Sequence, residues 1–217
     1  MKKKAVCCII IFSSGIVFAA APARQEDCRS GRGCRGTCMS LPVTRTLYMH
    51  PGFLCVPTLP TRLCTIIASG VAVTVFDRRN RLGGVGHYSH PLRVGEASTP
   101  EFAAPALVGL FRMFKRAGSD LRNLEICVYG GADNPLAPGF ESCRGILNTR
   151  MGFEILARLG VRPAGSDVGG RFARKLVFYT GTGESMLAKV DDYDVGDWYP
   201  HPAEGIRCRR EEGAGVL

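Results

Sequence analysis

The hydrophobic pattern in the middle of the chain first predicts a pair of adjacent strands. Residues 63–77 are rich in isoleucine and valine, which is typical of a strand. The polar residues 77–84 predict a turn, after which a second strand carries His87. Two strands joined by such a turn form a hairpin, and this hairpin brings positions 70 and 87 together.

Two stretches with helical spacing follow these strands. The run 98–101, Ser-Thr-Pro-Glu, is typical of a capping box, and the apolar stripe after it ends near Gly118. This first stripe consists of Phe102, Ala106, Leu107, Leu110, Phe111 and Phe114. A second helix is predicted over 144–159, ending before Gly160, with the stripe Leu147, Met151, Ile155 and Leu159. Two main helices packed against mixed β-strands predict one layered α+β domain.

Several short motifs, taken together, resemble one known family. They are His50-Pro51-Gly52, Ser69 to Val73, Gly84 to Pro91, Leu124 to Ala132, Asp167 to Gly170, Arg174 and Thr182-Gly183. In this order and spacing they are similar to the CheD-type chemoreceptor glutamine deamidases, over residues 46–190. The resemblance implies a CheD-like fold, a chemotaxis role, and protein partners, namely chemoreceptors and a CheC-type phosphatase.

The chain departs from this family at the position of the nucleophile. The family's strand reads Gly-Ser-Cys-Val-Ala-Val, and Gly70 stands where its catalytic cysteine would be. The resemblance implies that His87 is the catalytic histidine and Thr65 the active-site threonine. A cysteine–histidine pair attacks an amide carbonyl and passes a proton to the departing ammonia, whereas glycine offers no attacking atom. The chain is therefore predicted to be a pseudoenzyme that binds a protein partner.

A relocated nucleophile is the alternative. Cys64 or Thr65, with His87, would then keep an amide hydrolase active, although a buried apolar role is common for such a cysteine. Ser69 is expected to face away from the site because side chains alternate along a strand. A second departure is Leu147, which stands where the family's Ile-Gly-x-Arg-Asn motif has arginine.

The amino terminus predicts export. Residues 1–23 combine three lysines, an apolar run and small residues, which is typical of a secretory signal peptide. The alternatives are an uncleaved membrane anchor, or a misassigned start codon in a cytoplasmic protein. An exported copy would not reach the cytoplasmic helices of chemoreceptors. Residues 24–45 then form a Cys/Arg/Gly-rich extension, and the polar tail 191–217 is expected to lie outside the fold.

Composition excludes several other functions. Loss of the leader lysines lowers the net charge from +9 to +6, which is modest for a nucleic-acid partner. The ten cysteines fit an exported chain. The cluster Cys28, Cys34 and Cys38 lacks a fourth ligand at zinc spacing, so no metal is predicted. The glycine runs lack a following helix, so no nucleotide cofactor is predicted either.

Overall fold

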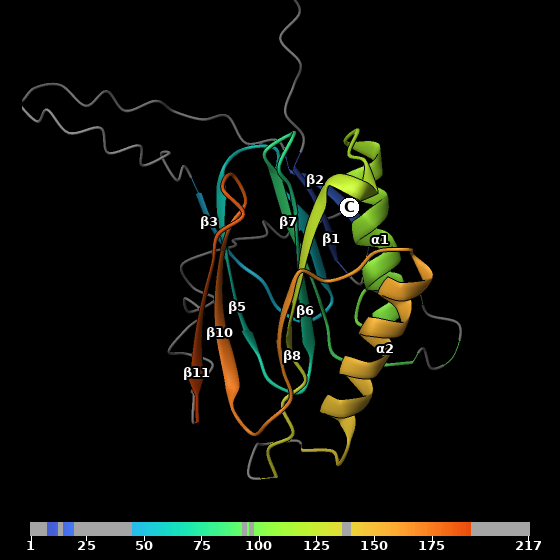
Figure 1. Cartoon of the computed structure of the whole chain (residues 1–217), viewed down its shortest axis with the longest axis vertical. Helices are drawn as coiled ribbons and strands as arrows, with labels where there is room; N and C mark the ends of the chain where they lie inside the picture. Colours follow the sequence, from blue (N-terminus) through green and yellow to red (C-terminus); the bar gives the residue numbers. More distant parts are fainter. Residues whose placement is uncertain are drawn as a thin grey trace, which may run out of the picture.

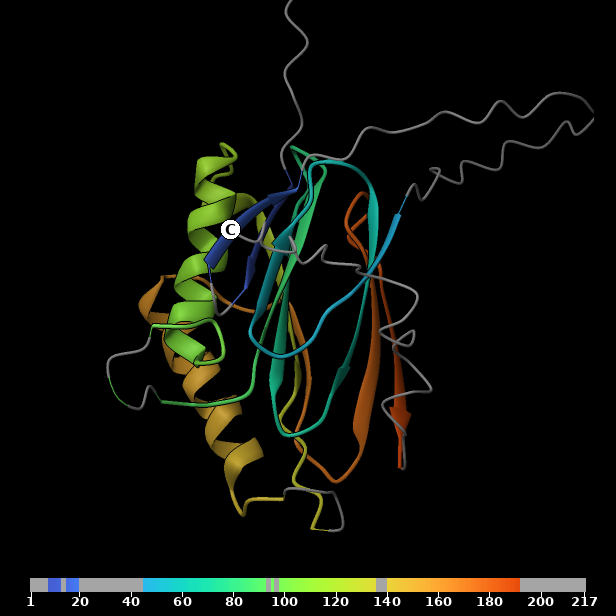
Figure 2. The ribbon, with the colours of Figure 1, turned by 180° about the vertical axis from the view of Figure 1, so that it is seen from behind.

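The computed structural model describes residues 45–92, 95, 98–135 and 140–191, and the backbone alone of 8–12 and 15–19. These residues form three layers (Figure 1). Two helices cover one face of a large sheet, and a smaller sheet covers its other face (Figure 2). The predicted α+β layered fold is confirmed.

The large sheet, sheet A, has seven strands in the order β2-β1-β4-β7-β6-β8-β9. Neighbouring strands are antiparallel except β8 and β9, which are parallel. Its strands are β1 (Cys8–Phe12), β2 (Gly15–Ala19), β4 (Phe53–Val56), β6 (Val71–Asp77), β7 (Leu82–Tyr88), β8 (Leu124–Gly130) and β9 (Gly165–Val168).

The smaller sheet, sheet B, has four strands in the order β11-β10-β5-β3. β3 runs parallel to β5, and the other pairs are antiparallel. Its strands are β3 (Arg45–Tyr48), β5 (Thr61–Ile67), β10 (Ala173–Tyr179) and β11 (Ser185–Val190).

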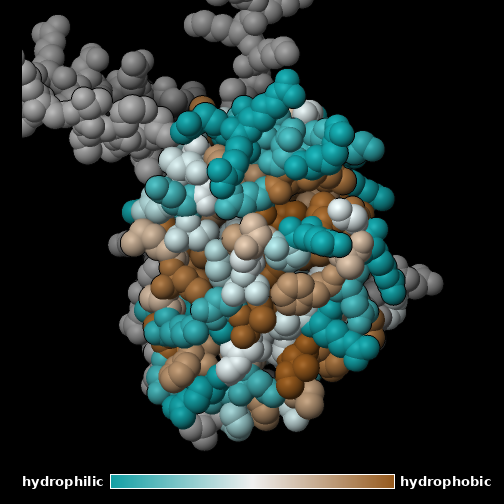
Figure 3. Space-filling model, in the orientation of Figure 1, coloured by the Kyte–Doolittle hydropathy of each residue, from teal (hydrophilic) through white to brown (hydrophobic). Residues whose placement is uncertain are grey.

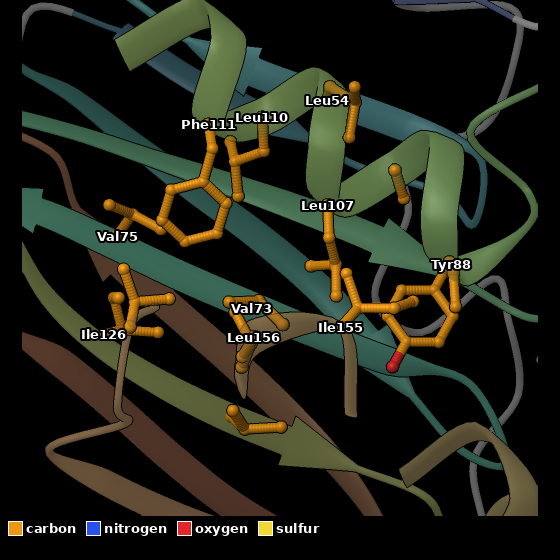
Figure 4. Packing of buried hydrophobic residues seen from close by; sticks show 14 of the residues in the cluster. Leu54, Val73, Val75, Tyr88, Leu107, Leu110, Phe111, Ile126, Ile155 and Leu156 are labelled. Carbon is orange, nitrogen blue, oxygen red and sulfur yellow. The ribbon is translucent and has the colours of Figure 1, made fainter. Parts of the chain in front are cut away.

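Two hydrophobic cores hold the layers together. The helices α1 (Ala103–Arg116) and α2 (Arg144–Arg158) pack on sheet A through a core that includes Leu107, Leu110, Phe111 and Leu156 (Figure 4). A second core between the sheets consists of Met49, Cys55, Leu63, Ile67, Ala72, Phe76, Val85, Leu176 and Phe178. The centre of the face that sheet B turns toward sheet A is therefore removed from water, while Leu47 and Leu187 at its margins are only partly buried.

The segment 63–77 is not one strand. It contains β5 and β6, which belong to different sheets, and residues 68–70 form the bend that crosses from sheet B to sheet A. The alternation argument for Ser69 therefore fails, because the serine lies in the bend. The predicted hairpin is correct: β6 and β7 pair with Ala72 opposite His87.

The helices follow the prediction in extent but not in every contact. The predicted capping box is wrong: α1 begins at Ala103, and no side chain caps it. A backbone hydrogen bond satisfies the first amide of the helix instead: the amide of Ala103 donates to the carbonyl of His90 at 2.9 Å. The apolar stripe of α1 from Ala106 to Phe114 is confirmed, and so is an end near Gly118, because the last helical residue is Arg116.

The buried face of α2 agrees with the prediction only in part: Ile155 lies in the core and Met151 and Leu159 pack against it, but Leu147 does not. Leu147 is 48% exposed, whereas the face toward the sheet carries Gly145, Asn148, Gly152, Ile155 and Leu156. A side chain on Gly145 would collide with the carbonyl oxygens of Gly131 and Ala132. The backbone of α2 at Gly145 therefore packs directly against the backbone of residues 131–132, and Leu147 faces solvent.

Several predictions about the termini stay predictions. Part of the predicted signal peptide forms β1 and β2, whose backbone extends sheet A beyond β4. Cys28, Cys34 and Cys38 and most of the tail lie outside the described residues. In the described part of the chain, Cys64, Cys127 and Cys143 are free thiols. No helix in that part is long and apolar enough to cross a membrane.

Candidate functional site

Thr65 and His87 meet between the two sheets. Thr65 lies on β5 with its side chain facing sheet A, and His87 lies on β7 with its side chain facing sheet B. The hydroxyl oxygen of Thr65 is 3.0 Å from Nδ1 of His87. Both side chains are buried, at 2% and 1% exposure. The two residues that the sequence singled out are therefore in direct contact.

The hydrogen bonds around Thr65 fix the tautomer of His87. The Thr65 hydroxyl donates its only proton to the carbonyl oxygen of Met49 at 2.7 Å. It must therefore accept at Nδ1, so Nδ1 of His87 carries the proton. Nε2 is left with a free lone pair, which is the form a histidine needs to accept a proton from a nucleophile.

Burial keeps this imidazole neutral. It lowers the pKa of His87 from 6.5 to about 3, with a smaller contribution from the neighbouring charge of His50. A buried group resists ionisation because the charged form loses its hydration. At neutral pH, His87 is thus a neutral base whose tautomer is set by Thr65.

Gly70 occupies the place from which a nucleophile would reach His87. A Cβ atom built on Gly70 would lie 3.1 Å from Nε2 of His87. The same Cβ would lie 2.7 Å from the carbonyl oxygen of Tyr88, closer than such atoms approach in proteins. The carbonyl oxygen of Tyr88, the last residue of β7, therefore occupies part of the space that a side chain at position 70 would need.

Asn148 ties together the chain segments around Gly70. Its side-chain amide donates to the carbonyl oxygens of Ser69 and Ser89, each at 2.9 Å. Asn148 is fully buried, and its Oδ1 has no hydrogen-bond partner in the described part of the chain. The asparagine of the α2 motif thus holds the bend before β6 against the end of β7. Its hydrogen-bonding role was not predicted from the sequence.

The residues considered as relocated nucleophiles are poorly placed. Thr65 faces the inside of the sandwich, so its neighbour Cys64 faces the opposite side of sheet B. Burial also raises the pKa of the Cys64 thiol, which disfavours the reactive thiolate. Thr65 itself lies at Nδ1, the protonated nitrogen, and not at the basic Nε2.

The Asp167 to Gly170 motif and Arg174 form a support beside the site. Arg174 is 2% exposed and donates to Asp167 Oδ1 at 2.7 Å and to the carbonyl oxygen of Gly169 at 2.7 Å. The carbonyl of the next residue, Gly170, accepts from the amide of Asp133 at 2.8 Å. The preceding amide of Ala132 donates to Ala68, in the bend beside Gly70. These motif residues are structural here.

A shallow cavity lies away from His87, at the end of the molecule where β6 turns into β7. Polar residues dominate this end in Figure 3. The cavity measures about 720 Å³ and is lined by Arg78, Arg79, Arg122, Asn123, Leu124, Glu125 and Ala164. Arg78 pairs with Glu125, and Arg122 pairs with Asp120, so most of the positive charge is already balanced. Within the described residues, no cluster of three potential metal ligands occurs.

Comparisons with known proteins point to one class, proteins of chemotactic sensory transduction. A family model described as CheD chemotactic sensory transduction matches residues 91–189. A probable chemoreceptor glutamine deamidase CheD of Geobacter sulfurreducens is 31% identical over 145 residues, which cover 67% of this chain and 90% of the relative. Similar relatives occur in Anaeromyxobacter dehalogenans (30%, covering 66% and 84%) and Ralstonia nicotianae (29%, covering 82% and 76%).

The chain therefore belongs to the CheD family. The span matched by the family model begins after His87, so it includes neither Gly70 nor Thr65. The case for these positions rests on the contacts between Thr65, His87 and Gly70.

Proposed function

We propose that this protein is a CheD-family member that no longer deamidates glutamine and acts by binding a protein partner. One observation carries the proposal. The base is complete, with Nε2 of His87 unprotonated and Nδ1 held by Thr65. The atom that this base would activate is missing at Gly70.

The closed geometry around Gly70 supports the same conclusion. A water molecule activated by His87 would replace the thiol only if it reached Nε2. The residue is 1% exposed, and the carbonyl of Tyr88 stands 2.7 Å from the position of the missing Cβ. The orientation of Cys64 and the engagement of Thr65 with Nδ1 argue against the relocated nucleophile.

The test measures ammonia release from a glutamine-bearing chemoreceptor fragment, and the accompanying change in peptide mass. We expect no turnover by the unmodified protein, by Gly70→Ala or by Gly70→Cys/His87→Ala. Gly70→Ala is the matched control for Gly70→Cys because both place a Cβ against Tyr88, while only cysteine adds a thiol. Turnover that appears only in Gly70→Cys supports the proposal. Turnover by the unmodified protein that is lost in His87→Ala refutes it.

Binding is tested separately with the same receptor fragment and with a CheC-type phosphatase. Calorimetric titration with the unmodified protein gives the affinity without any need for turnover. Saturable binding to either protein supports the binding role. An absence of binding to both removes the family's partners from the proposal and leaves the loss of catalysis to be judged by the ammonia assay alone.

We further propose that the protein is exported, because residues 1–23 have the composition of a signal peptide. Export explains a lost nucleophile, since an exported copy is separated from the cytoplasmic domains of chemoreceptors. Mass spectrometry of the native amino terminus tests the idea. A mature chain that begins at Pro22 or Arg24 supports export, and a chain that keeps Met1 and fractionates with the cytoplasm refutes it.

A further inference from the structure

The backbone of the predicted leader is part of sheet A in the folded chain. β1 and β2 pair antiparallel, from Cys8 opposite Ala19 to Phe12 opposite Gly15. β1 also pairs antiparallel with β4, where residues 9–11 lie opposite residues 54–56. Figure 1 draws both strands in blue. The two strands, called the leader hairpin below, therefore dock on β4 and extend the sheet beyond it.

The leader hairpin includes a residue of the predicted cleavage site. Signal peptides are cut after a small-x-small motif, and two such motifs overlap here, Ala19-Ala20-Ala21 and Ala21-Pro22-Ala23. Ala19 is the last residue of β2 and lies opposite Cys8. Proteases act on chain segments that have opened, and a backbone paired in a sheet has not opened. Cleavage after Ala21 therefore requires the end of β2 to leave the sheet.

The same residues suit two different environments. Residues 9–11 are three isoleucines and residues 16–18 read Ile-Val-Phe, and both runs are typical of strands. The run 5–20 carries no charged residue, which is also typical of the apolar part of a signal peptide. One segment thus has two alternative partners, which are β4 of its own chain and the export machinery.

We propose that the folded chain protects its own leader from cleavage, because docking of the leader hairpin on β4 holds the end of β2 in the sheet. The proposal rests on the proposed export, since only an exported chain undergoes this cleavage. Folding and processing then compete for the same residues. A chain that folds before export keeps its leader as two strands of sheet A, whereas a processed chain has β4 at the edge of that sheet.

The topology lets the hairpin open separately from the rest of the fold. Among the described strands, β2 is at the end of sheet A and β1 lies between β2 and β4. Undocking therefore breaks the short β1–β4 ladder and leaves β4 paired with β7 through residues 53–55. A local opening of this kind costs less free energy than unfolding of the whole domain. Single substitutions in the hairpin should therefore change the protection of the leader.

Elastase cleavage of the purified, unprocessed full chain tests the proposal, because this protease has a small specificity pocket that suits alanine. Cleavage after residues 19–21 is followed by mass spectrometry. Ile10→Pro is the test variant, since Ile10 lies opposite both Val17 and Cys55 and proline removes a backbone donor from the ladder. This cleavage should become about tenfold faster or more in Ile10→Pro. Ile10→Val is the matched control, which keeps the donor and should behave like the unmodified protein.

Cleavage after Ala106 reports whether the domain as a whole has opened. Ala106 is fully buried on α1, so this cleavage should stay slow in the unmodified protein and in the variants. If Ile10→Pro also accelerates it, Val17→Pro takes its place, because Val17 lies on β2, one strand further from β4. Faster cleavage after residues 19–21 with an unchanged rate at Ala106 supports the proposal in either variant.

Two outcomes overturn the proposal. One is an equal rate of cleavage after residues 19–21 in the unmodified protein and in both proline variants. The other is a rate that rises only together with the rate at Ala106, because the leader would then have no protection separate from the whole fold. Both outcomes are measured on the purified chain, so they are distinct from a failure of export itself, which the native amino terminus reveals.

Discussion

Replacing Thr65 by valine removes one hydroxyl from the interior while preserving the shape of the side chain. The hydroxyl donates to the carbonyl of Met49 and accepts from Nδ1 of His87. Valine leaves both of these buried groups without their partner. The substitution therefore separates the hydrogen bonds from the packing of Thr65.

The expected loss follows from the number of orphaned groups. A buried donor or acceptor without a partner costs about 1–3 kcal/mol. Two such groups, partly relieved by local adjustment, give an expected loss of about 2–4 kcal/mol in the free energy of unfolding. With a urea dependence of about 2 kcal/mol per M, the unfolding midpoint should fall by about 1–2 M.

Urea unfolding under reducing conditions measures this loss, with Thr65→Ser as the control that keeps the hydroxyl. Nitrogen NMR of His87 provides a second readout. The unmodified protein should show the Nδ1-protonated tautomer, and Thr65→Val should relax that preference. A loss below about 0.5 kcal/mol, the range of ordinary surface changes, would refute the reasoning that Thr65 holds the histidine.

Three further predictions concern the surrounding contacts. Because the pKa of His87 is about 3 in the folded protein and 6.5 is its ordinary value, the unfolded chain binds more protons between these values. Stability should therefore fall as the pH drops from 6.5 toward 3, by at most about 1.4 kcal/mol per pH unit from this group, and urea titrations of His87→Gln should show a flatter profile. Asn148→Ala removes two hydrogen bonds to the part-buried carbonyls of Ser69 and Ser89 and should lose about 1–3 kcal/mol by urea unfolding. Its exposed neighbour makes a good contrast, since Leu147→Arg should change stability by less than about 0.5 kcal/mol. Arg174→Met removes the hydrogen bonds to Asp167 and to the carbonyls of Phe172 and Gly169, but Asp167 is 32% exposed and keeps its ion pair with Lys189. The free energy of unfolding should therefore fall by about 1–3 kcal/mol, and a thermal shift equal to that of a surface variant would contradict this.

The sequence predicted the layered fold because its strongest signals are periodic. The stripe of α1 and the β6–β7 hairpin follow from hydrophobic spacing alone, and both occur as expected. The break between β5 and β6 carries no such signal. The break consists of Ala68, Ser69 and Gly70. These three small residues are too short an interruption to divide the apolar run into two predicted strands.

The errors at α2 and at the site have a common physical cause. Contacts made by glycine and by backbone carbonyls leave no trace in a hydrophobic pattern. The buried face of α2 includes Gly145 and Gly152, which the predicted stripe missed, whereas Leu147, which it included, is exposed. The rest of the stripe does pack in or against the core. In the same way, the resemblance identified Gly70 as a missing nucleophile. That the carbonyl oxygen of Tyr88 lies against Gly70 could not be predicted, because it depends on how the folded chain brings the two residues together.

The hydrogen bond between Thr65 and His87 also joins two separate sheets. Thr65 belongs to sheet B and His87 to sheet A, and both are buried at the seam. The pair therefore also connects the two layers of the fold. Selection for folding alone would preserve such a contact, so the presence of this histidine and threonine in a CheD relative does not by itself indicate an active enzyme.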